Sequence, residues 1–140
     1  MSGLIDWIND RFGTIANWLV LLACVISAGN AASRYLFSAS SNAWLEVQWY
    51  MFAGIVLLGG PYTLKVNEHV RVDLVYSSVS DRTRIWIDIV GLTLFLLPIC
   101  VVLTYFTYPW FVESYRQHEY SPNAGGLLRW PVKVLLPIGF

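Results

Sequence analysis

Hydrophobic residues gather into four runs along the chain, separated by short polar segments. The first run covers residues 14–36, the second 45–64 and the third 85–110. Each approaches or exceeds the length of about 20 residues with which a helix crosses the hydrocarbon core of a bilayer. A fourth run begins at Trp130 and reaches the end of the sequence at Phe140. The pattern predicts an all-α integral membrane protein with four transmembrane helices.

The fourth run is too short to cross a membrane by itself. At about 1.5 Å of rise per residue, residues 130–140 cover about half of a hydrocarbon core that is roughly 30 Å thick. Apolar residues continue to the end of the run without a stop signal. We therefore expect the natural helix to continue beyond Phe140. A short re-entrant or interfacial segment is the alternative.

A different pattern precedes the first run. Apolar and polar residues interleave there: Leu4, Ile5, Trp7, Ile8 and Phe12 with Asp6, Asn9, Asp10 and Arg11. This pattern is typical of a short amphipathic helix that lies in the membrane interface. A frayed N-terminus with aromatic anchors is the alternative. We expect this helix and the four spans to form a single transmembrane domain over residues 1–140.

Composition agrees with a membrane protein, because 56% of the residues are hydrophobic and only 13% are charged. A soluble domain of this length would need more charged surface. The net charge of zero provides no basic field for nucleic acid. Cys24 and Cys100 lie inside apolar runs and match no zinc or haem-attachment spacing, so we interpret them as small core residues.

Basic residues between the second and third runs predict the orientation. Lys65, Arg71, Arg82 and Arg84 all lie in this connection. Because cytoplasmic loops of membrane proteins carry an excess of Lys and Arg, the connection should be cytoplasmic. The N-terminus then lies in the cytoplasm as well, and Arg34 faces the opposite side.

Ionisable residues are confined to the ends of the predicted spans. Arg34, Glu46 and Asp88 all lie close to a predicted interface, where the cost of about 3 kcal/mol for a charge at the membrane centre is reduced. An ion pair between Arg34 and Glu46 and two separately solvated anchors are equally consistent with the sequence. A transport pathway normally places an ionisable group near the midplane. This chain is therefore better suited to bracing a transporter than to forming the pathway.

Proline and glycine mark irregular places in two spans. Pro98 removes a backbone donor inside the third span and leaves the carbonyl of Leu94 without its usual partner, which predicts a kink. Gly54, Gly59 and Gly60 allow a neighbouring helix to approach the second span closely. That neighbour is either a helix of this chain or a helix of a partner subunit.

Enzyme functions find little support in the sequence. A haem-binding anchor of a respiratory redox enzyme would need histidines on facing helices, but His69 and His118 fall on opposite sides of the predicted membrane. Gly125 and Gly126 fit no phosphate-binding loop, and no catalytic triad is evident. A small multidrug carrier would need a carboxylate in its first span, which has none. We predict no enzyme activity, no cofactor, no metal and no catalytic residue, and keep the redox anchor as the alternative function.

Three local strings carry a resemblance to a known family. Arg34, Tyr35 and Phe37, followed by Trp44 and Glu46, resemble the first external turn of the small, DctQ-like subunits of tripartite ATP-independent periplasmic (TRAP) transporters. Residues 69–73, with the sequence HVRVD, resemble their cytoplasmic signature. Residues 121–133 resemble the start of their final helix. The strings provide these candidate structural or interface residues: Arg34, Tyr35, Trp44, Glu46, His69, Arg71, Asp73, Arg129 and Trp130.

The resemblance implies a heteromeric secondary transporter in the bacterial inner membrane. In such a transporter a periplasmic, DctP-like binding protein captures a small organic acid. A large, DctM-like membrane subunit then moves the acid with a sodium gradient. The small subunit would be a scaffold that clamps the static part of the large subunit.

The loop between the second and third spans has a separate hypothesis. Valine residues alternate there with Arg71 and Asp73. We expect these two charges to pin the loop to helix ends through charge-assisted hydrogen bonds. A solvated basic loop that only sets the orientation is the alternative.

Overall fold

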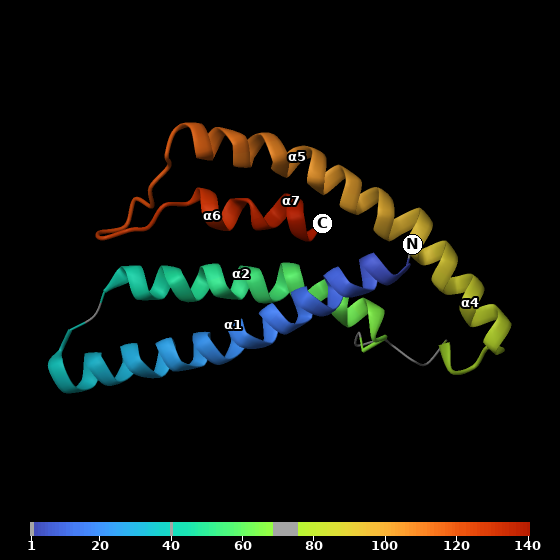
Figure 1. Cartoon of the computed structure of the whole chain (residues 1–140), viewed down its shortest axis with the longest axis horizontal. Helices are drawn as coiled ribbons and strands as arrows, with labels where there is room; N and C mark the ends of the chain where they lie inside the picture. Colours follow the sequence, from blue (N-terminus) through green and yellow to red (C-terminus); the bar gives the residue numbers. More distant parts are fainter. Residues whose placement is uncertain (1, 40, 69–75) are drawn as a thin grey trace.

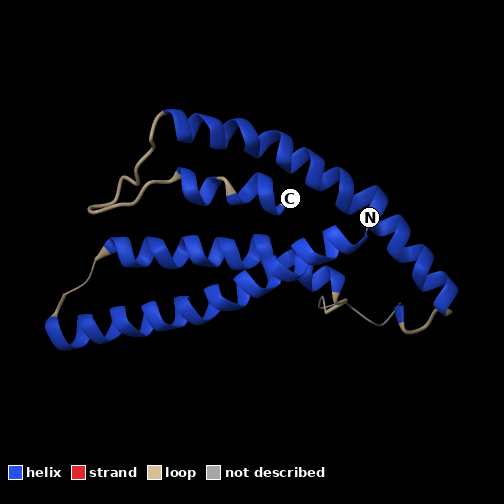
Figure 2. Cartoon of the chain, in the orientation of Figure 1, coloured by secondary structure: helices blue, strands red, loops and turns tan. Residues whose placement is uncertain are grey.

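The computed structural model describes residues 2–39, 41–68 and 76–140, and its regular structure there is helical. Among the residues that the structure describes, the only β-type contact is an isolated bridge between Tyr120 and Leu128. The all-α prediction is therefore confirmed for this part of the chain (Figure 2). The elements are α1 (Ser2–Phe37), α2 (Asn42–Lys65), α4 (Asp81–Val90), the π-helix η1 (Gly91–Leu96), α5 (Leu97–Arg116), α6 (Trp130–Lys133) and α7 (Leu135–Gly139).

The helices lie side by side and each contacts mainly its neighbours. Helix α2 lies between α1 and the α6–α7 segment, which in turn lies between α2 and α5 (Figure 1). The turn between α1 and α2 and the loop of residues 117–129 are at the same end, which we call the loop end. The opposite end, where α2 finishes, is the Lys65 end.

Small residues set the approach of α2 to its neighbours. A Cβ atom on Gly59 would lie 3.4 Å from the Cβ of Ala16 in α1, and one on Gly54 would lie 2.9 Å from Leu19. Nothing lies within 4 Å of such an atom on Gly60. Of the two alternatives for the neighbour, Gly54 and Gly59 therefore fit the helix of this chain.

Helix α1 is continuous from Ser2, so the predicted interfacial helix is not a separate element but the first turns of α1. Two acidic residues in these turns bind the end of α2. The Nζ atom of Lys65 lies 2.6 Å from Oδ1 of Asp10 and 3.8 Å from Oδ1 of Asp6. The ion pairs fix the first turns of α1 against the Lys65 end.

The irregularity predicted from Pro98 takes the form of a π-helix. Pro98 is the second residue of α5, and η1 directly precedes it. The N–H of Leu97 donates to the carbonyl of Leu92, five residues earlier. Because a proline cannot donate to the carbonyl four residues before it, a shift in hydrogen-bond register next to it is expected. The result is one long arm, α4–η1–α5, that curves without breaking (Figure 1).

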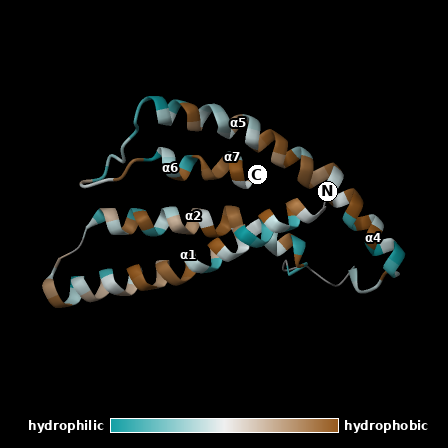
Figure 3. Cartoon of the chain, in the orientation of Figure 1, coloured by the Kyte–Doolittle hydropathy of each residue, from teal (hydrophilic) through white to brown (hydrophobic). Residues whose placement is uncertain are grey.

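Two described helical stretches are long and apolar enough to cross a membrane. They are Gly3–Phe37, whose most apolar 18-residue window has a mean hydropathy of 1.8, and Asp81–Arg116, where that window reaches 2.4. Trp130–Gly139 is a shorter apolar helix. Hydrophobic residues occupy long parts of α1 and of the arm (Figure 3).

The layer has almost no hydrophobic core of its own. Ala16, Met51 and Leu58 are the buried hydrophobic residues of the described part. Cys24 is exposed and Cys100 half-buried, so the prediction that both are core residues is wrong for the chain by itself. A single layer of helices leaves most side chains on one of its two open faces, which lipid or a partner must cover.

Candidate functional site

The carboxylate of Glu46 is the centre of a polar cluster at the loop end. Ser41 caps α2 by accepting a hydrogen bond from the N–H of Ala43 at 3.3 Å, and Glu46 follows in the next turn. Only 4% of Glu46 is exposed. Its position places a negative charge near the positive N-terminal end of the helix dipole.

Three donors from the loop of residues 117–129 reach this carboxylate. The side-chain amide of Asn123 donates to Oε1 at 2.8 Å, and the backbone N–H of Leu127 donates to Oε2 at 2.8 Å. The hydroxyl of Ser121 also donates to Oε1. A buried carboxylate is costly unless it is hydrogen-bonded, and here both oxygens have donors. Glu46 thus holds the loop against the start of α2.

The loop is shaped to present these donors, and we call residues 119–129 the hairpin. The N–H of Ser121 donates to the carbonyl of Leu127 at 2.9 Å. Gly125 has φ of +73°, a conformation that residues with a Cβ rarely adopt. A Cβ on Gly126 would lie 2.5 Å from the Cβ of Ser121, so no larger residue fits. The two glycines therefore serve the turn.

An ion cluster anchors the other side of the hairpin. The Oε2 atom of Glu119 accepts a hydrogen bond from Nζ of Lys133 in α6. Its Oε1 atom lies 3.4 Å from Nη1 of Arg129. The Nζ of Lys133, a residue only 6% exposed, also lies 4.1 Å from the ring centroid of Trp110 in α5. The hydrogen bond from Lys133 is the largest of the causes that lower the pKa of Glu119 to about 2, and the contribution of Arg129 is smaller.

Tyr50 connects α2 to the hairpin, and Trp130 connects the start of α6 to α5. The hydroxyl of Tyr50 in α2 donates to the carbonyl of Leu128 at 3.1 Å. Trp130 packs edge-on against Tyr115 of α5 with ring centroids 5.4 Å apart. Together with the two polar clusters, these contacts join α2, α5 and α6 at the loop end.

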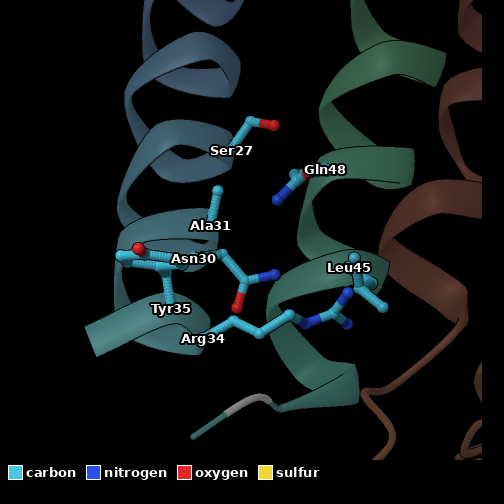
Figure 4. A pocket seen from close by; sticks show the side chains of 7 residues that line it. All are labelled: Ser27, Asn30, Ala31, Arg34, Tyr35, Leu45 and Gln48. Carbon is cyan, nitrogen blue, oxygen red and sulfur yellow. The ribbon is translucent and has the colours of Figure 1, made fainter. Parts of the chain in front are cut away.

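A second feature of the loop end is a cavity of about 530 Å³ between α1 and α2 (Figure 4). Figure 4 shows the guanidinium of Arg34 reaching from α1 towards α2 beside Leu45, with the amide of Asn30 close by. Gln48 lines the cavity from α2. The cavity is open, and most of the residues that line it carry polar groups.

The polar cluster binds segments of this chain to one another. Its acceptors and cations contact each other, so it offers no activated nucleophile. Among the described residues no group of three His, Cys, Asp or Glu side chains could hold a metal ion. The role of the cluster is to hold these segments together.

One family model matches most of the chain. The model of the DctQ component of tripartite ATP-independent periplasmic transporters matches residues 22–140. The chain belongs to the DctQ family. DctQ proteins are transporter components rather than enzymes, and the match gives no support to the redox-anchor alternative. No curated protein matches the chain.

The matched region contains the polar cluster, and the resemblance to DctQ that was read from the sequence is confirmed. Together with the two long apolar helices, the family places this DctQ chain in a membrane.

The residues predicted for the DctQ chain are found in three places. Glu46, Arg129 and Trp130 come together around the hairpin. Arg34 and Tyr35 line the cavity of Figure 4 instead, with Tyr35 88% exposed.

Trp44 lines a separate cavity of about 540 Å³. His69, Arg71 and Asp73, and with them the predicted pinning of their loop, lie outside the described residues.

Sequence reasoning missed the partners of Glu46. It considered Arg34 as the partner, because only a short turn separates the two residues. The actual donors are 75 to 81 positions away. It also overlooked Glu119 and Lys133. A signal existed, since Glu119 and the basic pair of Arg129 and Lys133 flank a glycine turn with opposite charges.

Proposed function

We propose that this DctQ chain is a static scaffold of a TRAP transporter in the bacterial inner membrane. It clamps the immobile part of a large, DctM-like subunit while the transport domain of that subunit moves. One observation carries the proposal. The polar residues at the two ends of the helices contact one another within the chain, whereas the long apolar helix faces have few contacts within it.

The middle of the helices supports a bracing role rather than a transport role. No charged residue occurs in residues 12–33, 47–64 or 89–112. A pathway for ions or acids normally includes an ionisable residue or a broken helix near the midplane. The driving ion and the solute would therefore pass through the large subunit.

The arm provides a surface that a partner can cover. Trp86, Phe95 and Phe106 are 62%, 66% and 68% exposed. Large apolar side chains exposed to this extent mark a lipid-facing or protein-facing region. Aromatic residues are enriched in the cores of protein interfaces, so part of this arm is suited to contact the large subunit.

The proposed placement has four spans, with α6 and α7 starting the fourth. The N-terminus and the basic connection between α2 and α4 face the cytoplasm, as the positive-inside rule requires. The hairpin then faces the periplasm, the side from which a DctP-like binding protein would deliver a small organic acid. A sodium gradient would drive import.

The test is reconstitution of the complete transporter. The tagged chain is expressed with its large subunit, purified in mild detergent and placed in proteoliposomes with the binding protein and its organic acid. We expect the large subunit to copurify in a fixed ratio and uptake to require both this chain and an inward sodium gradient. Full uptake by the large subunit alone would contradict the scaffold function.

The orientation has its own test. Cys24 and Cys100 are replaced by Ser, and single cysteines are introduced at Asn123 in the hairpin or at Asn67 in the connection after α2. A membrane-impermeant maleimide applied to spheroplasts should label Asn123→Cys and leave Asn67→Cys unlabelled until the membrane is opened. The reverse pattern would invert the proposed topology.

A further inference from the structure

Two cavities lie along the seam between α1 and α2, and we call the two together the groove. The cavity of Figure 4 includes Ser27 and Gln48, and a second cavity of about 260 Å³ includes Val20 and Ile55. On each helix these pairs are seven residues apart. Since seven residues are nearly two turns of an α-helix, each pair lies on the same helix face. The two cavities therefore lie one after the other on the same side of the seam.

The groove changes character along its length. At the loop end it presents donors of four kinds of side chain, from Ser27, Asn30, Arg34 and Gln48. No carboxylate lines this part among the residues that the structure describes. Towards the middle of the helices Val20, Ile55 and Val56 form apolar walls, and the polar residues Asn17, Tyr62 and Thr63 also line this second cavity. The groove is thus amphiphilic, with one cationic end.

We propose that this groove binds one phospholipid, with its phosphodiester at Arg34 and an acyl chain along the apolar part. The inference rests on the proposed membrane placement. A guanidinium matches phosphate geometry with paired, charge-assisted hydrogen bonds, and the amides of Asn30 and Gln48 add neutral donors.

The length of the groove fits a lipid in one leaflet. At about 1.5 Å per residue, Val20 lies roughly 21 Å along α1 from Arg34. Half of a bilayer of about 40–45 Å, headgroups included, is of the same length. A phosphate at Arg34 therefore lies at headgroup level while the acyl chain reaches Val20 near the midplane. A free phosphate ion would leave the apolar part unfilled.

Polar groups in a membrane helix also require partners. Asn30 and Gln48 face an open cavity where lipid tails would give them no hydrogen bonds. A headgroup at this position replaces the water that these amides lose. The groove is therefore more stable with a lipid than with hydrocarbon alone.

The experiment uses the full chain purified with its large subunit. Native mass spectrometry counts bound phospholipids after mild solubilisation. The delipidated complex is then titrated with dihexanoylphosphatidylglycerol and, in a separate arm, with inorganic phosphate. Arg34→Gln removes the cation, Ala31→Phe fills the cavity with the cation retained, and Arg116→Gln removes an exposed charge at the same end outside the groove.

We expect one retained lipid per chain in the wild type and in Arg116→Gln. Arg34→Gln should weaken binding of the short-chain lipid by about tenfold or more, because it removes a charge-assisted hydrogen bond. Ala31→Phe should weaken it similarly. Arg34→Lys, which keeps the charge without the planar fork, should retain part of the affinity.

Three results would overturn the proposal. Equal loss in Arg116→Gln would mean nonspecific lipid at the protein surface. Inorganic phosphate that binds as tightly as the lipid and displaces it would mean a free-anion site. Retention of lipid in Arg34→Gln together with loss of the large subunit would mean that a protein side chain occupies the groove. A different result would contradict the scaffold function: the large subunit would be absent from the wild-type preparation.

Discussion

The loop end and the arm are opposite kinds of structure within one chain. At the loop end Glu46 and Lys133 are buried, and each forms hydrogen bonds or ion pairs with groups of the same chain. In the most apolar stretch of the arm no residue is buried. The first region is stabilised by internal polar contacts, whereas the second depends on whatever covers it. Substitutions should therefore affect folding at the loop end and assembly along the arm.

The largest loss of stability should follow from Glu46→Ala. The change leaves the donors of Ser121, Asn123 and Leu127 without their acceptor and releases the hairpin from α2. We expect the apparent melting temperature of the purified chain to fall by about 5–10 °C.

Glu113→Ala at the same end is the matched control, because Glu113 is exposed and bonds only its own helix neighbour Gln117 in the described contacts. Its melting temperature should stay close to that of the wild type. Equal effects of the two substitutions would show that the contacts of Glu46 do not stabilise the loop end.

A smaller loss is expected from Gly126→Ala. The added Cβ would meet Ser121 at 2.5 Å and the carbonyl oxygen of Asn123 at 2.8 Å, so the hairpin must shift. Such overpacking typically costs about 1–3 kcal/mol. Gly29→Ala is the control, since nothing lies within 4 Å of its added atom. Thermal unfolding should rank Gly126→Ala below the wild type and Gly29→Ala at or above it.

Acid should loosen the same end gradually. Glu119 has a pKa of about 2 in the folded chain and an ordinary value of 4.5. Because the folded value is the lower one, its contribution to stability is complete above about pH 4.5 and is lost as the pH falls towards 2. The melting temperature should depend more steeply on pH in this window for the wild type than for Glu119→Gln. Parallel profiles would contradict the ion cluster.

The smallest effect on the isolated chain should come from the arm. Phe106 is 68% exposed, so Phe106→Ala should change the stability of the purified chain by less than about 0.5 kcal/mol. We expect the same variant to recover less of the large subunit in a tag purification. Destabilisation comparable to that of Glu46→Ala would remove the distinction between the two regions.

The sequence was sufficient for the helices because their signal is local. The runs 14–36, 45–64 and 85–110 all lie inside observed helical stretches, and Trp130 begins α6 as predicted. The observed helices extend further because the amphipathic turns at their ends continue the backbone hydrogen bonds. Nothing between Ser2 and Thr14 breaks the helix, so α1 includes the segment predicted to be separate.

The site was harder to predict because its contacts are not local. The sequence indicated that Glu46 needed an explanation, but it could not indicate which distant loop would return to α2. Loop 117–129 does so because α5 and α6 place it beside the start of α2. The side-by-side order of the helices therefore had to be known before Ser121 and Asn123 could be assigned to Glu46.

The separation of Glu46 from its partners also has a consequence for biosynthesis. Ser121 is made 75 residues after Glu46. At about 5–20 residues per second, the ribosome needs roughly 4–15 seconds to bridge this interval. During that time α1 and α2 exist while the donors for the carboxylate of Glu46 have not yet been made. The contact between α2 and the hairpin can therefore form only after the hairpin has emerged from the ribosome.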